Sequence, residues 1–108
     1  MLNLSNNSIE NLEINHPMAA LTELNLRKNS IKEVCDLKSL TRLQKLYLSN
    51  NQISTINAIS SLPMLQDLTM ENNPVDKSAG FVKFLRERFP SLNFYNLQKV
   101  TALFDIKA

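Results

Sequence analysis

The chain has 108 residues, of which 44% are apolar and 20% are charged, and its net charge is +2. This length corresponds to one small domain, which can bury enough surface to fold without disulfide bonds or a metal ion. A net charge this small does not by itself predict a nucleic-acid-binding protein.

A repeat of 22 residues occupies the chain from its start to about residue 75. The repeat has a column of asparagines, which consists of Asn7, Asn29, Asn51 and Asn73. Its most regular apolar columns are Leu2, Leu24, Leu46 and Leu68; Leu4, Leu26, Leu48 and Met70; and Ile9, Ile31, Ile53 and Val75. Agreement at so many positions predicts a stack of similar structural units.

Each unit reads LxxLxLxxNxI, for example LTELNLRKNSI and LQKLYLSNNQI. Alternation in the LxL segment puts both leucines on one face of a short strand, and neighbouring units stack these strands in parallel, ~4.8 Å apart. The leucines then form a core that no single unit could bury alone. An asparagine side chain both donates and accepts hydrogen bonds, so we expect the asparagine column to satisfy buried backbone groups where the chain turns.

This pattern resembles the leucine-rich-repeat family, in particular the 22-residue subclass found in phosphatase-regulatory subunits and similar intracellular proteins. The resemblance implies an α/β fold: a right-handed solenoid with a parallel sheet on its concave side and short 3-10 or helical segments on its convex side. The predicted convex segments are EVCDLKSLTR and TINAISSLPM. We therefore assign residues 1–75 to about 3.5 repeats.

At the N-terminus, the repeat pattern begins partway through its strand segment. The position that corresponds to Leu21, Leu43 and Leu65 would lie one residue before Met1. A solenoid end without a cap exposes apolar side chains and a strand edge. We therefore expect a fragment of a longer protein, whose Leu2, Leu4, Ile9 and Leu12 are only partly covered. The alternative is a genuine start that shields this end by self-association.

After the last repeat, residues 76–100 read as a C-terminal cap. Asp76 or Ser78 is the predicted N-cap of a helix that runs to about Phe89, where Pro90 follows. The predicted apolar face of this helix consists of Phe81, Val82, Leu85 and Phe89. For residues 101–108 two interpretations are open, a tail that packs on the cap and a linker to a further domain.

The run ENNPVDKSAGFVKFLRERFPSLNFYNLQKVT resembles the cap shared by the A-prime protein of a spliceosomal ribonucleoprotein and the leucine-rich-repeat light chain of axonemal dynein. Such caps read NPxx, an aromatic-rich helix, and then hPxLxxLDxxxV. The matching residues are Asn73, Pro74, Phe89, Pro90, Leu92, Tyr95, Asn96 and Val100. Tyr95 stands where the caps usually have Leu, and Asn96 where they usually have Asp.

The concave face is the predicted binding surface. Strand alternation turns its side chains away from the core, and stacking aligns them in columns. The candidate protein-binding residues are Glu23, Asn25, Arg27, Lys45, Tyr47, Asp67, Thr69 and Glu71, with Asn3, Ser5 and Ser49 on the same face. One interpretation is a ladder of ion pairs that keeps the sheet soluble. The other is a mixed-charge patch with one aromatic anchor, Tyr47, flanked by Arg27.

Residues for enzyme or cofactor chemistry are few. His16 is the only histidine, Cys35 the only cysteine, and Gly80 the only glycine. We therefore predict a protein that is not an enzyme and has no catalytic residues, no metal site and no cofactor. His16 and Cys35 fall on the predicted convex side.

The favoured function is a protein-interaction module, a fragment of a larger eukaryotic intracellular scaffold, ciliary or microtubule-associated protein. A single cysteine fits a reducing compartment, so we expect the cytoplasm, with the nucleus as alternative. The alternative function is a ribonucleoprotein subunit that holds a protein partner beside RNA, since residues 77–108 have six Lys or Arg against two Asp or Glu. Direct nucleic-acid binding is not expected otherwise. No membrane contact is predicted, because no apolar run approaches the ~20 residues that span a bilayer.

Overall fold

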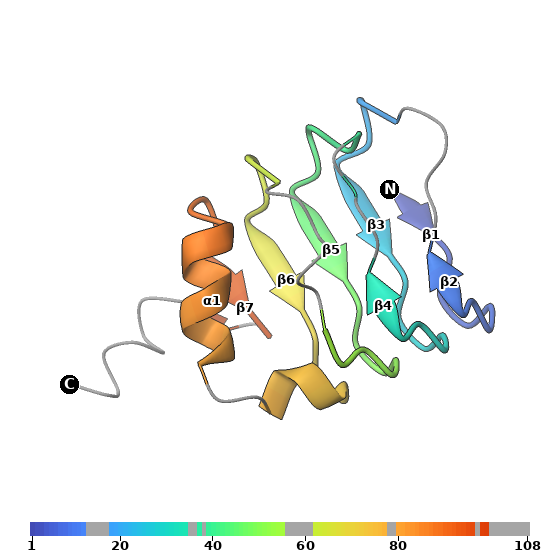
Figure 1. The fold of residues 1–108 in the computed structure, drawn as a ribbon. Helices are drawn as coiled ribbons and strands as arrows, with labels where there is room; N and C mark the ends of the chain where they lie inside the picture. The colour runs from blue at the N-terminus through green and yellow to red at the C-terminus, as the bar shows by residue number, and fades with distance from the viewer. Residues whose placement is uncertain are drawn as a thin grey trace.

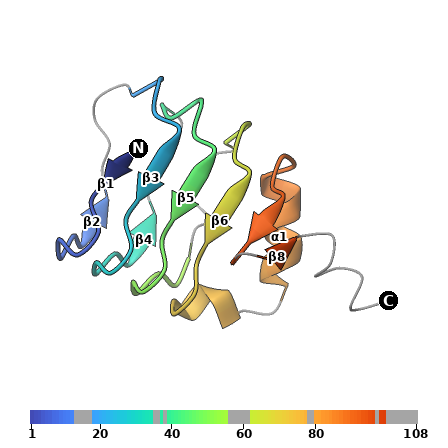
Figure 2. The same ribbon diagram turned by 180° about the vertical axis from the view of Figure 1, so that it is seen from behind.

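The computed structural model describes residues 1–12, 18–34, 37, 39–55, 62–77, 80–96 and 98–99. Its main sheet has the strand order β1-β3-β5-β6-β7-β8. These strands are β1 (Leu2–Asn3), β3 (Glu23–Asn25), β5 (Lys45–Tyr47), β6 (Asp67–Thr69), β7 (Phe94–Tyr95) and β8 (Gln98–Lys99). Figure 1 shows β1, β3, β5 and β6 side by side, and Figure 2 shows the same row from behind.

The strands of the repeats pair in parallel with the register that the 22-residue period predicts. Leu24 lies between Leu2 and Leu46 as a strand partner of both, and Leu46 is in turn paired with Leu68. β7 continues the parallel order beside β6, whereas β8 pairs with β7 antiparallel. The predicted fold class is therefore confirmed by the sheet.

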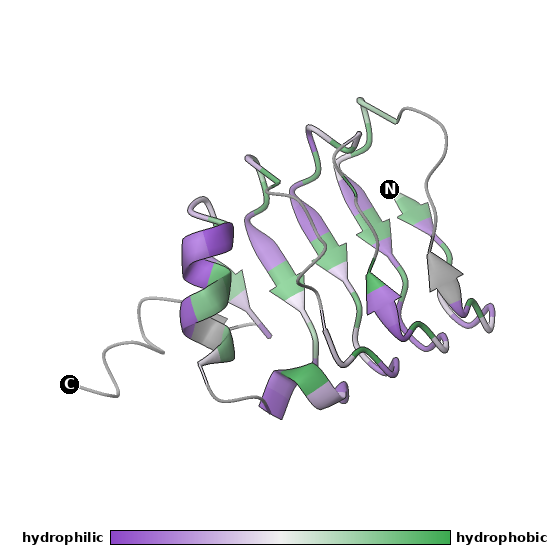
Figure 3. Ribbon diagram, in the orientation of Figure 1, coloured by the Kyte–Doolittle hydropathy of each residue, from purple (hydrophilic) through white to green (hydrophobic). Residues whose placement is uncertain are grey.

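The core lies on one face of this sheet. In β3 and β5 the central leucine is buried and its two neighbours are half-buried. Figure 3 shows this alternation as purple and green bands along the strands. Leucines and isoleucines of the repeat columns form one apolar cluster, and burying each such side chain contributes roughly 1.5–3 kcal/mol.

A left-handed residue stands before each asparagine of the column. The φ angle is 60° at Asn6, 57° at Lys28, 61° at Asn50 and 59° at Asn72. Asparagine tolerates this conformation better than most residues, which explains why three of these four residues are asparagine. The chain thereby reverses direction directly after each strand.

The asparagine column bonds the turns to one another, as predicted. The amide group of Asn51 donates to the carbonyls of Leu26 and Leu48, at 3.0 and 2.9 Å. Its side-chain oxygen accepts the backbone N–H of Ile31 at 3.1 Å. Asn29 and Asn73 make equivalent bonds. The role of these buried side chains is therefore structural.

The segments after the asparagines differ from the prediction. They open with a second parallel ladder, in which β2 (Asn11–Leu12) pairs with β4 (Glu33–Val34). Glu33 is also bridged to Thr55 in the next unit. The chain stays extended because units stacked at one period keep exchanging backbone bonds beyond the turn, such as Gln52 N–H to the Ile31 carbonyl at 2.9 Å. The later parts of both predicted convex segments lie largely outside the described residues.

In its described residues, the segment after the last repeat has two helices. The 3-10 helix η1 (Pro74–Lys77) comes first, and α1 (Phe81–Arg88) follows at the end of the sheet beside β7, as Figures 1 and 2 show. The predicted N-cap is wrong for Asp76, and Ser78 lies outside the described residues. Gly80 is the N-cap residue and has φ of 74°, a conformation in which glycine has little strain.

Asp76 is not available as an N-cap because other groups bind its carboxylate. The Tyr95 hydroxyl and the Asn96 amide both donate to it. Burial, together with the hydrogen bond to this carboxylate, raises the pKa of Tyr95 far above its usual value. The Tyr95 ring packs edge-on against the Phe81 ring, and the two ring centroids lie 5.9 Å apart. The two residues that depart from the cap pattern, Tyr95 and Asn96, therefore share one partner, which is Asp76.

Three of the four residues predicted for the apolar face of the helix are buried. Phe81, Leu85 and Phe89 belong to the same cluster as the repeat leucines, while the side chain of Val82 is not described. At the other end of the sheet Leu2, Leu4 and Ile9 are only half-buried, although their equivalents in later repeats are buried. The side chain of Leu12 is not described.

Candidate protein-binding face

The open face is the face of the main sheet opposite the leucine core. Its first column holds Glu23, Lys45 and Asp67, and its second holds Asn25, Tyr47 and Thr69, as the strand register requires. Arg27, Ser49 and Glu71 stand two residues after the ends of the three strands and form a third column, with backbone bonds between neighbouring turns. The structure therefore brings together all eight predicted binding residues.

Charged pairs on this face are weak. Lys45 Nζ lies 3.8 Å from Glu23 Oε1, and the two side chains are 41% and 34% exposed. Such a solvent-exposed pair contributes about 0.2–1 kcal/mol. Among the residues that the structure describes, the Asp67 carboxylate has no hydrogen-bond or ion-pair partner. The ladder of ion pairs considered from the sequence is thus incomplete at β6.

Arg27 covers one side of the Tyr47 ring. Its guanidinium carbon lies 4.2 Å from the ring centroid, close enough for a cation–π contact of about 0.5–1 kcal/mol. The backbone N–H of Arg27 donates to the side-chain oxygen of Asn25 at 3.1 Å. The predicted anchor and its flanking cation therefore contact each other in the chain alone.

Two small residues of the face are more buried than the alternation predicts. Ser49 is 7% exposed and Thr69 is 3% exposed. Both are short side chains in columns whose other members are longer, so they lie lower than their neighbours. The Thr69 hydroxyl is also the one buried side-chain polar atom without a hydrogen-bond partner in the described part of the chain.

A second aromatic side chain lies on the open face, so the prediction that Tyr47 is the only one there is wrong. Phe94 in β7 is 37% exposed and is the strand partner of Asp67. A signal for it exists in the sequence. Residues 92–96, LNFYN, repeat the positions of residues 65–69, LQDLT, at a spacing of 27 rather than 22 residues.

A hollow of about 250 Å³ opens on this face between β5, β6 and β7. Its lining consists of Tyr47, Asp67, Leu68, Thr69 and Phe94. The hollow therefore combines two aromatic rings, one unpaired carboxylate and one hydroxyl without a partner. Groups of this kind bind ligands through apolar contact and charge, and they form no recognisable catalytic set.

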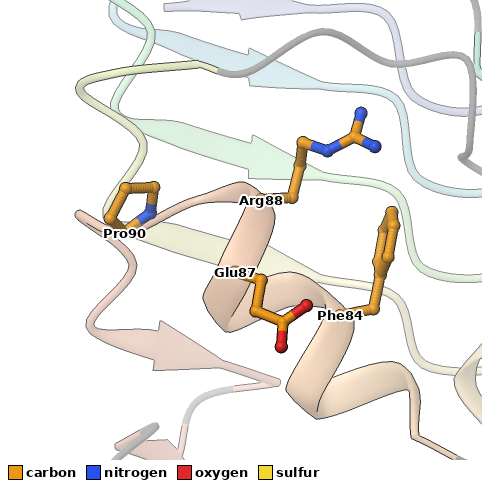
Figure 4. Close-up of a pocket in the computed structure, with 4 residues that line it drawn as sticks. All are labelled: Phe84, Glu87, Arg88 and Pro90. Carbon is orange, nitrogen blue, oxygen red and sulfur yellow. The ribbon is translucent and has the colours of Figure 1, made fainter.

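A second hollow, of about 320 Å³, lies beside helix α1 and is lined by Phe84, Glu87, Arg88 and Pro90 (Figure 4). The guanidinium carbon of Arg88 lies 5.1 Å from the Phe84 ring centroid, and Figure 4 shows Glu87 pointing away from both. Lys83 and Arg86 on the same helix are exposed. This is the basic surface that the sequence predicts near the C-terminus.

The described residues contain no group of three potential metal-binding side chains. No helix in the described ranges is long and apolar enough to cross a membrane. His16 and Cys35, which the sequence places on the convex side, lie outside those ranges. The perturbed residue Tyr95 is 4% exposed and holds Asp76, so its environment serves the fold.

Comparison with known proteins addresses the fold. The family described as Leucine rich repeat matches residues 19–75. A chain of the Drosophila melanogaster SNF/U2A' complex matches with a TM-score of 0.77 and 18% identity, over 95% of this chain and 65% of that chain. A chain of the Chaetomium Mex67:Mtr2 subunits matches with a TM-score of 0.60 and 21% identity, over 80% of this chain and 66% of that one. The comparison with curated proteins finds no match.

The chain spans just under two thirds of the length of both solved structures. At identities of 18% and 21%, these similarities establish the fold alone. The predicted resemblance to the A-prime protein is confirmed at that level.

Proposed function

This chain belongs to the leucine-rich-repeat family, and from that premise we propose that it is a non-enzymatic module that binds another protein through the open face of its main sheet. The observation that carries the proposal is the pair of aromatic side chains, Tyr47 and Phe94, that the fold leaves accessible on this face. Neither belongs to an apolar repeat column, so their position is not required by the core.

The composition of the face supports binding to a protein. Solenoids commonly use the surface formed by their stacked strands for recognition. Tyr and Arg are the residue types enriched where binding energy concentrates, and Tyr47 and Arg27 already contact each other. A partner that covers the ring gains a large apolar contact area with little side-chain ordering, since the ring is held before binding.

A position-specific cross-linking experiment tests this proposal. A photoreactive residue is placed at Glu71, on the exposed edge of the open face, and as a matched control at Gln52, exposed in the turn after Asn51. We expect one protein partner to cross-link from position 71 and not from position 52. Cross-linking from position 52 alone would contradict the proposal.

The second candidate function is a ribonucleoprotein subunit that holds a protein partner next to RNA. Two observations favour it, the exposed cations Lys83 and Arg86 on α1, and the structural match to a chain of a complex named SNF/U2A'. Contacts of several cations with phosphates make affinity fall steeply as salt increases. Such contacts lose most of their affinity between roughly 50 and 200 mM salt. An affinity for RNA that hardly changes over this range of salt would exclude this function.

The cellular setting is part of the same proposal. We place the chain in an intracellular eukaryotic protein, a scaffold or a component of cilia or microtubules, in the cytoplasm, with the nucleus as alternative. A single cysteine supports this, because the chain has no pair of thiols to form an internal disulfide. Imaging of the tagged protein in cells would test the compartment, and secretion of the protein would contradict it.

A further inference from the structure

The hollow between β5, β6 and β7 has a chemistry that the fold does not use. We propose that it is a subsite for one arginine side chain of the protein partner. The inference rests on the proposed function and names the group by which the partner is recognised. Three features carry it: the unpaired carboxylate, the two rings and the hydroxyl without a partner.

The charge of the hollow selects a cation. On the open face, Glu23 faces Lys45 at 3.8 Å, and Arg27 lies over Tyr47 at 4.2 Å. Asp67 is left without a partner among the described residues, and it lines the hollow. An arriving cation therefore pairs with a carboxylate that has no ion pair to lose, whereas an arriving anion meets an unpaired negative charge.

The rings select a planar cation over a compact one. Tyr47 and Phe94 line the hollow on either side of the β6 residues, since β6 lies between β5 and β7. A guanidinium stacks on aromatic faces and binds a carboxylate through two parallel N–H groups, while an ammonium is a hydrated point charge. The guanidinium carbon of Arg27 already lies over the Tyr47 ring of the same face.

Thr69 supplies the third feature. It is 3% exposed and lines the hollow, and its buried hydroxyl has no hydrogen-bond partner among the described residues. A rotation of about 120° about χ1 moves the hydroxyl oxygen into another staggered position, from which it can accept a guanidinium N–H. The hydroxyl gives up no existing hydrogen bond in that rotation.

The size of the hollow matches one side chain. Its volume of about 250 Å³ is smaller than the ~300–1,000 Å³ of sites that enclose a whole small-molecule ligand. It also opens onto the sheet face rather than lying inside the core. A single long side chain projecting from a protein surface fits this geometry.

The experiment measures the binding of three small probes to the isotope-labelled full chain by nuclear magnetic resonance. The probes are N-acetyl-arginine amide, its lysine counterpart, and its citrulline counterpart, which has nearly the same shape as arginine but no charge. We expect the arginine probe to shift resonances of Tyr47, Thr69 and Phe94, at millimolar affinity. The lysine and citrulline probes should bind at least threefold more weakly.

Matched variants separate the hollow from the general charge of the face. Asp67→Asn and Glu71→Gln each remove one negative charge, but only Asp67 lines the hollow. We expect Asp67→Asn to weaken the arginine probe at least fivefold and Glu71→Gln to change it less than twofold. Phe94→Leu keeps an apolar side chain and should weaken binding of the arginine probe about threefold. This variant provides the test if Asp67→Asn disturbs the fold.

Four results would overturn the subsite: no shifts at the hollow, equal losses in Asp67→Asn and Glu71→Gln, equal binding of citrulline, or equal binding of lysine. The proposed function fails on different grounds. If the intact partner binds through Tyr47 but Asp67→Asn leaves its affinity unchanged, the face binds protein and the arginine subsite is wrong. If none of the substitutions on the open face changes the affinity for the partner, the proposed function is wrong.

Discussion

Replacing Asn51 by alanine removes three short hydrogen bonds from the interior. The Asn51 amide group donates to the Leu26 and Leu48 carbonyls, and its oxygen accepts from Ile31, all at 2.9–3.1 Å. Asn51 is 7% exposed, so water does not readily take its place. At about 1 kcal/mol for each lost bond, the free energy of unfolding should fall by about 3 kcal/mol.

The column supplies its own control. Asn7 occupies the same position of the first repeat but is exposed, and its amide group donates only to Leu4 and Ser5 of its own turn. Water can replace those bonds, so Asn7→Ala should cost less than about 1 kcal/mol. Asn51→Asp should cost at least as much as Asn51→Ala, because a carboxylate oxygen then faces two carbonyls.

Urea denaturation followed by circular dichroism measures these differences. The midpoint should decrease in the order wild type, Asn7→Ala, Asn51→Ala, with a similar slope m throughout. Equal losses for Asn7→Ala and Asn51→Ala, or a loss under about 0.5 kcal/mol for Asn51→Ala, would refute the reasoning. The asparagine column would then be a sequence regularity without the energetic role that its bonds indicate.

Three further predictions concern other parts of the chain. The folded-state pKa of Tyr95 is raised above its unfolded value near 10, so its contribution to stability is complete below pH 10 and is lost as pH rises above it. Above pH 10 the free energy of unfolding of the wild type should therefore fall by up to about 1.4 kcal/mol per pH unit more than that of Tyr95→Phe, and alkaline denaturation curves would measure the difference. Gly80→Ala meets no steric clash but places a side chain at φ of 74°, so thermal melts should show a loss of about 1 kcal/mol, and an unchanged melting temperature would contradict the strain. Half-buried Leu2, Leu4 and Ile9 should promote concentration-dependent association of this chain, which Leu4→Ser would reduce; sedimentation of a strict monomer at high concentration would argue against it.

The sequence predicts the repeats well because their period determines which residues become neighbours. Once Leu24 is equivalent to Leu46, the strand register and the columns of the open face follow from stacking alone. The same reasoning predicts the hydrogen bonds of the asparagine column. The placement of the candidate residues on one face can therefore be predicted wherever the 22-residue period holds.

The features that the sequence did not predict arise where the 22-residue period ends, or where contacts with residues distant in the sequence determine the local structure. Phe94 enters the open face at a spacing of 27 residues, so a search at a single period misses it. The predicted start of the helix at Asp76 is too early because Asp76 binds Tyr95 and Asn96, residues about 20 positions away. Thr69 is buried although its column faces outward, and it lines the hollow together with Tyr47 and Phe94 from two other strands.

The central claim is that the open face binds a protein partner, and the most direct measurement compares two double variants. Tyr47→Ala with Arg27→Ala removes the aromatic anchor and its cation, whereas Lys83→Ala with Arg86→Ala removes two exposed cations of α1. For a partner captured with the full chain, calorimetry should show a loss of about 1–3 kcal/mol in binding free energy for the first variant and little change for the second. An unchanged affinity for the first variant and a loss for the second would place the interface on the basic helix and contradict the account.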